Sequence, residues 1–183
     1  MAYYYKPSKF VVSWLLIGAI LVVWDATYLL FRPLSFPGGS LHWIWSPYEV
    51  YMEIDYVYGL PAFEDGNGFA TGQAIINLFE STMNFIFVYT SLFSSNKSLR
   101  LAGAFIGLTG AMSSFSKTVL YFLTEYFSGW KYVGHNTTMD FYTLYILPSA
   151  PWIVFNLYAV YEISNDLKKA LVAYPDEEIK KTQ

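Results

Sequence analysis

Four long apolar runs dominate this 183-residue chain, with approximate bounds Val11–Phe31, Ala70–Phe93, Leu101–Phe127 and Phe141–Tyr161. A helix of about 20 mostly apolar residues spans the hydrocarbon core of a bilayer. Within a bilayer the backbone must satisfy its own hydrogen bonds, which a helix does inside a single segment. The sequence therefore predicts an all-α membrane protein, a single four-transmembrane-helix bundle over residues 1–183 with a polar tail at 164–183.

Composition excludes several classes of protein. Hydrophobic residues make up 55% of the chain and aromatic residues 21%, which is too apolar for a disordered chain or an ordinary soluble domain. There is no cysteine, and the two histidines, His42 and His135, lie far apart outside the runs, so we expect no metal centre and no cofactor. No basic stripe points to nucleic acid. The first run is too long for the apolar part of a cleavable signal, so we expect it to remain as a span.

The basic residues outside the runs predict how the bundle is oriented, because lysine and arginine gather on the cytosolic side of a membrane. The opposite side contains only Arg32 and Lys131. The head, the second loop and the tail contain the others: Lys6, Lys9, Lys97, Arg100, Lys168, Lys169, Lys180 and Lys181. We therefore expect both termini in the cytosol and the first and third loops on the lumenal side.

The last four residues, Lys180-Lys181-Thr182-Gln183, resemble a dilysine retrieval signal, which must be both cytosolic and terminal. Together with the predicted orientation, they indicate a multi-pass protein of the endoplasmic reticulum membrane. The alternative is an ordinary basic end of a solvated tail.

Three of the apolar runs contain an ionisable residue, namely Asp25, Glu80 and Lys117. A charge at the bilayer centre costs about 2.5–3.5 kcal/mol on insertion scales, so such residues face a bundle interior or a cavity. Counted from the lumenal ends of their helices, the three fall in one layer with Ser149 and Trp152. This convergence predicts a site inside the bundle.

Helical spacing gives each run one polar or small-residue stripe. The second run has Asn77, Glu80 and Asn84 on one face, and the fourth has Tyr145, Ser149 and Trp152. The third run places Gly103 and Gly107 on the same face as Lys117 and Tyr121. The alternative interpretation is that these stripes only form hydrogen bonds between helices.

Two prolines, Pro148 and Pro151, interrupt the fourth run in this layer, which predicts either a widened cavity or a packing kink. The first loop contains Leu41-His42-Trp43-Ile44-Trp45, and this density of aromatic residues indicates a lid over the cavity or an anchor at the membrane surface. We expect the loop acids Glu53, Asp55, Glu64 and Asp65 to be solvated, and Glu125 to lie at the polar rim.

Four segments of the chain share motifs with one family of membrane proteins. The third run contains Val119-Leu120-Tyr121-Phe122-Leu123-Thr124-Glu125. The other segments are Phe79-Glu80-Ser81-Thr82, Ser149-Ala150-Pro151-Trp152 and the loop pattern Tyr48-x-x-Tyr51-x-x-x-Asp55-x-x-Tyr58. They resemble segments of the emopamil-binding-protein (EXPERA domain) family, and the motif of the third run looks like the family signature. This family of four- to five-span endoplasmic reticulum proteins includes the sterol Δ8–Δ7 isomerase and the sigma-2 receptor.

The resemblance implies a catalytic glutamate at Glu80, a cation-facing tryptophan at Trp152, and an acid at Asp25 where the sigma-2 receptor has an aspartate. The sequence departs from the isomerase at Leu29, Thr118 and Ser149, where that enzyme has a glutamate, an aspartate and an asparagine. Lys117 is foreign to the pattern. These departures favour a specialised isomerase or cyclase over ordinary sterol isomerisation.

Chemistry of this type protonates an alkene, passes through a carbocation and removes a proton elsewhere. Glu80 is the expected acid and Asp25 the expected base or relay. The alternatives are an ion pair between Glu80 and Lys117, and a pairing of Asp25 with Arg32. Further candidates for binding the substrate or stabilising its cation are Trp152, Tyr121, Tyr145, Ser149, Asn77, Asn84 and Tyr58.

The expected partners are membrane lipid and a lipophilic, terpenoid or sterol-like substrate. Two other classes of function remain open. One is a non-catalytic protein that binds sterols or cationic amphiphiles, as the sigma-2 receptor does. The other is a trafficking partner or homodimer that associates through Gly103 and Gly107.

Overall fold

A computed structural model of the chain describes the backbone of residues 7–181 and the side chains of residues 7–173. Lys6 and the dilysine-like end Lys180–Gln183 lie outside the part whose side chains are described. All regular elements of the described chain are helical, which confirms the predicted all-α class.

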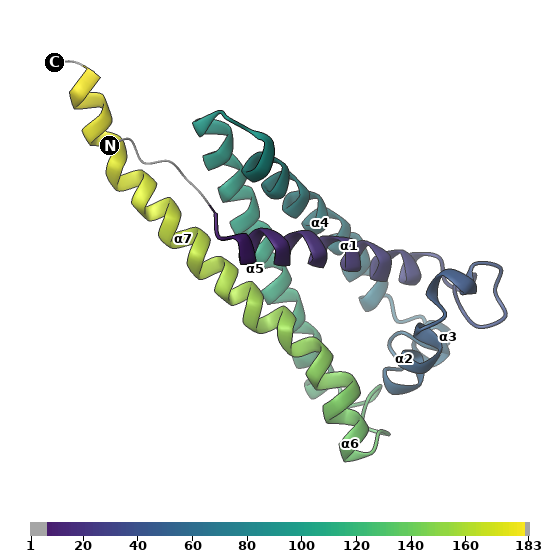
Figure 1. Ribbon diagram of the computed structural model, residues 1–183. Coiled ribbons are helices and arrows are strands. Elements are labelled where there is room, and N and C mark those ends of the chain that lie inside the picture. The colour runs from purple at the N-terminus through teal and green to yellow at the C-terminus, as the bar shows by residue number, and fades with distance from the viewer. Residues whose placement is uncertain (1–6, 182–183) are drawn as a thin grey trace.

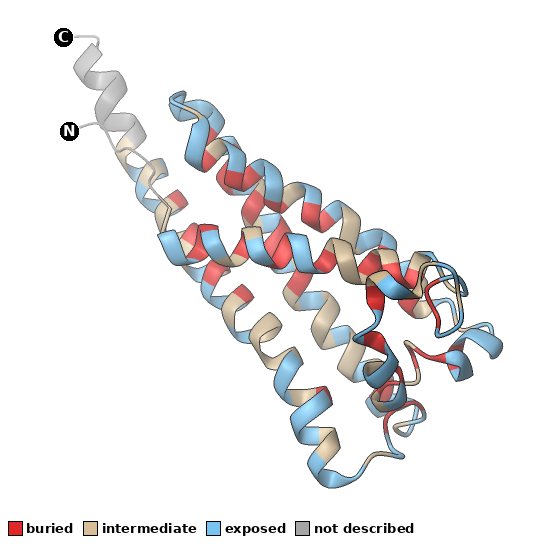
Figure 2. Ribbon diagram, turned by 45° about the vertical axis from the view of Figure 1, so that its right-hand side comes forward, coloured by how far each residue is buried: buried red, intermediate tan, exposed pale blue. Residues whose placement is uncertain are grey.

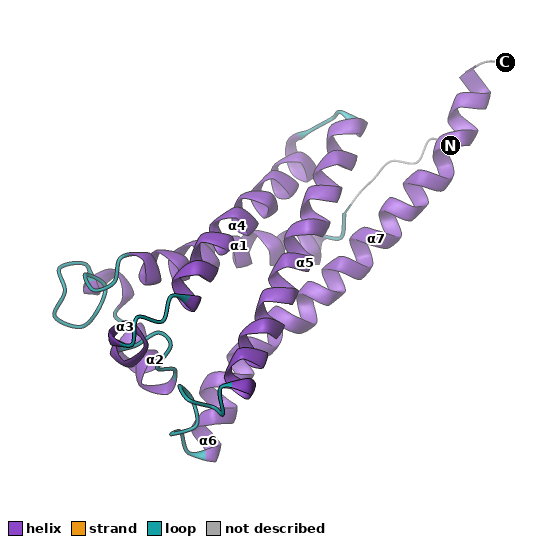
Figure 3. Ribbon diagram, turned by 180° about the vertical axis from the view of Figure 1, so that it is seen from behind, coloured by secondary structure: helices purple, strands orange, loops and turns teal. Residues whose placement is uncertain are grey.

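Four long helices form the body of the molecule: α1 (Lys9–Leu30), α4 (Phe69–Phe93), α5 (Lys97–Phe127) and α7 (Leu147–Lys181). They pack in the order α1, α4, α5, α7, and α1 crosses the others obliquely (Figure 1). The connections contain five short elements: η1 (His42–Trp45), α2 (Tyr48–Ile54), α3 (Leu60–Glu64), α6 (Thr138–Asp140) and η2 (Phe141–Ile146). These short elements gather at one end of the bundle, away from the start of α1 and the end of α7 (Figure 3).

The third long helix begins four residues before the predicted start. The Asn96 side chain accepts hydrogen bonds from the backbone N–H groups of Ser98 (2.9 Å) and Leu99 (3.2 Å) and so caps α5. An asparagine in this position satisfies donors that the first helical turn leaves free. The polar residues from Lys97 to Arg100 therefore belong to the helix, although they are not part of the apolar run.

The fourth long helix differs most from the prediction. The chain stays helical beyond the predicted end of the fourth span at Tyr161, because α7 continues to Lys181 and so includes most of the polar tail at 164–183. The helix also passes through Pro148 and Pro151 without a break. The irregular turn lies just before them, in the π-helical segment η2, where the Leu147 N–H bonds to the Tyr142 carbonyl five residues back.

The buried side chains line the facing sides of the four long helices (Figure 2). Gly103, Gly107 and Gly110 of α5 are buried against α4. An added Cβ would lie 1.9 Å from Thr90 Oγ1 at Gly103 and 2.5 Å from the Phe87 ring at Gly107. This stripe therefore packs within the chain, where Thr90 and Phe87 of α4 cover Gly103 and Gly107.

Two of the helices are long and apolar enough to cross a membrane by length and composition, within the described residues. They are Lys9–Leu30, which is α1, and the helical stretch Thr138–Ala173. Both correspond to predicted spans. These two helices are weak evidence for a membrane protein, since the same test is passed by buried core helices.

Candidate functional site

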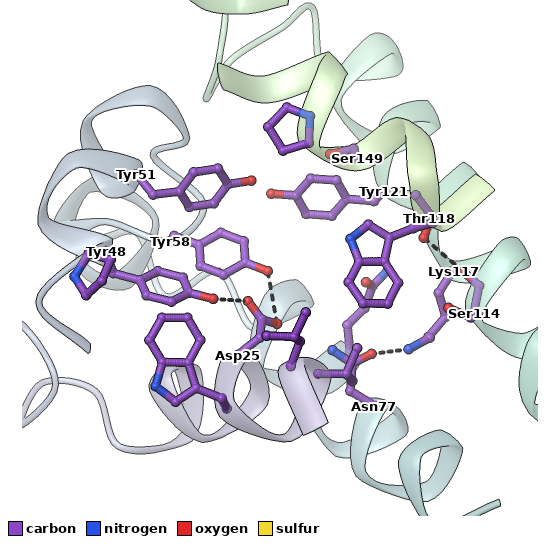
Figure 4. A pocket seen from close by; sticks show the side chains of 17 residues that line it. Asp25, Tyr48, Tyr51, Tyr58, Asn77, Ser114, Lys117, Thr118, Tyr121 and Ser149 are labelled. Atoms are coloured by element: carbon purple, nitrogen blue, oxygen red, sulfur yellow. Dashed lines mark hydrogen bonds between the residues drawn. The ribbon is translucent and has the colours of Figure 1, made fainter. Parts of the chain in front are cut away.

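A cavity of about 420 Å³ lies at the loop end of the bundle, within the range of roughly 300–1,000 Å³ that is usual for small-molecule sites. The four long helices and the segment around α2 all contribute to its wall, so the aromatic first loop closes one end (Figure 4). Polar and aromatic side chains of the wall include Trp24, Asp25, Tyr48, Tyr51, Tyr58, Gln73, Asn77, Ser114, Lys117, Thr118, Tyr121, Ser149 and Trp152.

Asp25 of α1 is held by two loop tyrosines. The Tyr48 hydroxyl donates to Oδ1, and the Tyr58 hydroxyl donates to Oδ2 at 3.3 Å. The Tyr48 ring stacks on Tyr28 with a centroid distance of 4.2 Å, which fixes its position. Burial, the carboxylate of Asp25 and the hydrogen bond to it raise the pKa of Tyr48 far above its usual value, so this hydroxyl keeps its proton.

The alternative pairing of Asp25 with Arg32 does not occur. Arg32 Nη1 donates to the Val57 carbonyl (3.1 Å), and Nη2 donates to Thr71 Oγ1 (2.9 Å). Arg32 therefore ties the first loop to α4 and forms no ion pair with Asp25.

The opposite wall contains Lys117 of α5. Its Nζ lies 2.5 Å from Glu80 Oε2 and also donates to Asn77 Oδ1. Lys117 and Asn77 face the cavity, whereas Glu80 is 2% exposed and lies behind Lys117, off the wall. The ion pair that the sequence left as an alternative is therefore present.

Trp152 of α7 reaches the wall because Gly18 leaves room for it. A Cβ at Gly18 would lie 3.2 Å from the indole ring. Trp14 packs on the same indole with a centroid distance of 5.2 Å, and its Nε1 donates to Asn156 Oδ1 at 3.1 Å. The indole face is thus fixed by residues of both α1 and α7.

Asp55 was expected to be solvated, and this expectation is wrong. Its side chain is fully buried, accepts the Val57 N–H at 3.0 Å on Oδ1 and accepts the Tyr121 hydroxyl on Oδ2. Burial is the main cause that raises the pKa of Asp55 to about 7, against an ordinary value of 3.8. Tyr121 lies on the cavity wall, so Asp55 touches the site through this ring.

Glu125 is 2% exposed and so does not lie at a solvated rim. Its Oε2 accepts the backbone N–H of Tyr132 at 3.1 Å. The carboxylate therefore holds the loop after α5 against the end of that helix.

Seven of the predicted site residues line the cavity, and three do not. Tyr145 is fully buried beside it, with its ring 5.3 Å from that of Phe122, and supports the wall from behind. Asn84 packs where a Cβ of Gly110 would lie, about two turns from the cavity. Glu80 is the third. The seven on the wall are Asp25, Tyr58, Asn77, Lys117, Tyr121, Ser149 and Trp152.

Tyr48 and Tyr51 also line the wall, although neither was among the predicted site residues. Their signal was present in the spacing Tyr48-x-x-Tyr51, which puts both rings on one face of the short helix α2. The tyrosines of the first loop follow no single helical or strand spacing, so the sequence alone did not predict which of their side chains face the cavity.

The charges on the wall determine what the cavity can bind. Of the residue types Asp, Glu, Lys, Arg and His, the cavity lining contains Asp25 and Lys117. The carboxylate of Glu80 neutralises the charge of Lys117. An ionised Asp25 therefore leaves the site with about one net negative charge, next to the faces of Trp152 and several tyrosines. Aromatic faces and a carboxylate both favour a positive charge inside the cavity.

No group of three or more His, Asp or Glu side chains in the described part of the chain could hold a metal ion. No protein-family model matches this sequence, and neither a curated protein nor a solved structure matches it. The chemistry of the site therefore has to follow from its own residues.

Proposed function

We propose that this protein is an integral membrane isomerase or cyclase, similar to the emopamil-binding-protein family, that acts on an apolar terpenoid or sterol-like lipid. The observation that supports this most is the pairing of one carboxyl, Asp25, with a largely aromatic cavity whose other charge is already neutralised. Such a site stabilises a carbocation without offering a strong nucleophile that would trap it.

Asp25, rather than Glu80, is the proposed acid. A protonated Asp25 gives its proton to a substrate alkene, and the π electron pair forms the new C–H bond, which leaves a cation on the neighbouring carbon. Loss of a proton from an adjacent carbon then forms the shifted double bond. In a cyclisation, a second alkene of the substrate attacks the cation before that proton leaves. Neither route changes the oxidation state of the substrate, so no redox cofactor is required.

Two hydroxyl partners suit a carboxyl that changes its protonation state. An ionised Asp25 accepts from Tyr48 and Tyr58, and a protonated Asp25 donates to one of the same hydroxyls. The geometry therefore holds the acid in place before and after proton transfer.

The proposal includes a membrane location for all four long helices, in a multi-pass arrangement with the C-terminus cytosolic, in the endoplasmic reticulum. Several polar residues of α4 and α5 are buried, among them Glu80, Asn84 and Ser114, while large apolar side chains such as Phe79, Phe105 and Leu120 are exposed. Exposed Thr82 and Thr109 donate to the carbonyls four residues earlier, at 2.8 and 3.0 Å. This arrangement suits lipid rather than water on the outside.

Orientation can be tested by inserting glycosylation acceptor sites. A site inserted at Gly66, in the loop before α4, should be glycosylated, and one at Ser95, between α4 and α5, should not. Glycosylation at Ser95 alone would reverse the proposed orientation.

Activity can be tested with purified protein in lipid nanodiscs, given a Δ8 sterol or an acyclic polyprenyl lipid, followed by mass analysis of the products. The wild type should convert one of these lipids, Asp25→Asn should lower turnover by about 10²–10⁴-fold, and the exposed-acid control Glu64→Gln should be unaffected. Conversion that survives in Asp25→Asn would remove Asp25 as the acid.

A second candidate function, binding of a cationic amphiphile without turnover, is favoured by the two hydroxyls that donate to Asp25, since they stabilise the carboxylate. A steroid with a tertiary amine and its uncharged carbon analogue separate the two functions. Tight binding of the amine that is lost in Asp25→Asn, with no lipid converted, would support a receptor rather than an enzyme.

A further inference from the structure

The cavity touches two buried carboxyls, and the proposed chemistry uses one of them. Asp25 lies on the wall with Tyr48 and Tyr58. Asp55 lies behind the wall, and Tyr121 is interposed between it and the cavity. The Tyr51 side chain also interacts with the Asp55 carboxyl and lowers the pKa of that group. Figure 4 shows the hydroxyls of Tyr51 and Tyr121 directed toward each other from opposite sides of the cavity.

We propose that Asp55, acting through the Tyr121 hydroxyl, receives the proton that leaves the substrate cation. A proton would then enter the substrate at Asp25 and leave it on the side of the cavity formed by Tyr51 and Tyr121. This inference rests on the proposed isomerase or cyclase function, and it assigns the base for the second half of that reaction. Asp55 is a positioning residue in this scheme, because Tyr121 is the group that faces the substrate.

The step balances without any other reactant. The Tyr121 oxygen takes a proton from the carbon next to the cation as its own O–H proton passes to the Asp55 carboxylate. The two electrons of the broken C–H bond form the new double bond. Asp55 later returns its proton to water, and Asp25 takes one from water, so the cycle is neutral.

A base needs an ionised form at working pH, and Asp55 is suited to this. Its pKa of about 7 lets it take up and release a proton near neutrality. The titratable groups that face it are Tyr51 from α2, Tyr58 from the loop, Tyr121 and Glu125 from α5, and Tyr145 from η2. Four of these are tyrosines, and the acidic neighbour among them, Glu125, opposes ionisation of Asp55 and raises its pKa.

Asp55→Asn and Tyr121→Phe test the inference, with the exposed pair Glu64→Gln and Tyr126→Phe as controls. The substrates are the same Δ8 sterol and acyclic polyprenyl lipid, prepared with and without deuterium at the allylic carbons. For the lipid that the wild type converts, turnover should increase as the pH rises through about 7. Both test variants should lose this dependence of turnover on pH. Their turnover should fall on the order of 10²-fold, and the isotope effect on turnover should increase, because removal of the proton becomes the slow step.

The inference is overturned if Asp55→Asn keeps the wild-type dependence of turnover on pH and the wild-type isotope effect while the wild type remains active. That result would leave the proposed function standing, with a different base. A wild type that converts neither lipid would overturn both proposals. Asp55→Asn keeps an oxygen that can accept the Val57 N–H, and Tyr121→Phe keeps the aromatic ring. Because the two variants change different side chains, the same kinetic change in both indicates loss of the base rather than a failure to fold.

Discussion

The ammonium of Lys117 lies 2.5 Å from a carboxylate oxygen of Glu80, with 13% and 2% of the two side chains exposed. An isolated charge at this depth would be costly, and a close pair offsets that cost for both residues. The pair also removes Glu80 from the cavity wall and leaves Asp25 as its acid. Lys117, which fits the family resemblance least, therefore separates the two carboxyl groups by position, with Glu80 in an ion pair and Asp25 on the wall.

Removal of one member of this pair should be far more damaging than removal of both. Glu80→Leu or Lys117→Met alone leaves a buried unpaired charge and should lower the free energy of unfolding by about 3–5 kcal/mol. The double variant Glu80→Leu/Lys117→Met should regain most of that loss. Denaturation in detergent, arranged as a double-mutant cycle, measures this. Additive losses would mean that the two charges do not interact.

The hydroxyl of Tyr48 should matter for the binding of cations. Tyr48→Phe keeps the ring stacked on Tyr28 and removes the hydrogen bond to Asp25. Loss of a hydrogen bond to a charged group costs about 1.5–3 kcal/mol, so affinity for the tertiary-amine steroid should change by roughly 10- to 150-fold. Titration with the amine and with its carbon analogue checks this, and the exposed Tyr142→Phe is the matched control. An equal change for both ligands would point to altered shape rather than altered charge.

The glycine stripe of α5 should tolerate no side chain. At Gly107 a Cβ would meet the Phe87 ring at 2.5 Å, so Gly107→Leu should destabilise the fold by about 1–3 kcal/mol or more. Gly72→Leu, at a position with open space, should have little effect. Thermal unfolding measures the loss. Size-exclusion chromatography with light scattering should give one oligomeric state for the wild type and both variants, because this stripe faces the chain's own α4.

Stability should depend on pH through Asp55. Its pKa rises from 3.8 to about 7 on folding, so the folded state binds more protons between these values. The resulting stabilisation is complete below pH 4 and is lost as the pH rises through 7. Asp55→Asn should flatten this dependence and be more stable than the wild type at pH 8, by a few kcal/mol at most. Unfolding curves at pH 5 and pH 8 compare the two proteins, and a variant that is less stable than the wild type at pH 8 would contradict the assignment.

The long helices could be predicted because length and apolar content are local properties. The sequence placed Asp25, Lys117, Ser149 and Trp152 in one layer by counting residues along each helix, and all four line the cavity. Depth follows from the rise of 1.5 Å per residue, so antiparallel helices need no further information to bring such residues level.

Rotation of a side chain about its helix axis and the path of a loop were harder to predict. Glu80 shares a face with Asn77, yet Lys117 holds Glu80 behind the wall, and this depends on a contact 37 residues away in sequence. Asp55 lies in a loop of polar character, where burial depends on Tyr121 and Tyr51 closing over it. Neither arrangement leaves a periodic signal in the chain.

The glycines of α5 occupy its first half, whereas Lys117 and Tyr121 lie in its second half. Where Gly103 and Gly107 sit, α4 and α5 touch closely, and Lys117 and Tyr121, further along the helix, line the cavity. The residues of α5 that pack closely against α4 and the residues that line the cavity thus lie in different turns of one helix. Substitutions near Lys117 and Tyr121 can therefore change the lining of the cavity while the contact that joins the helices is left untouched.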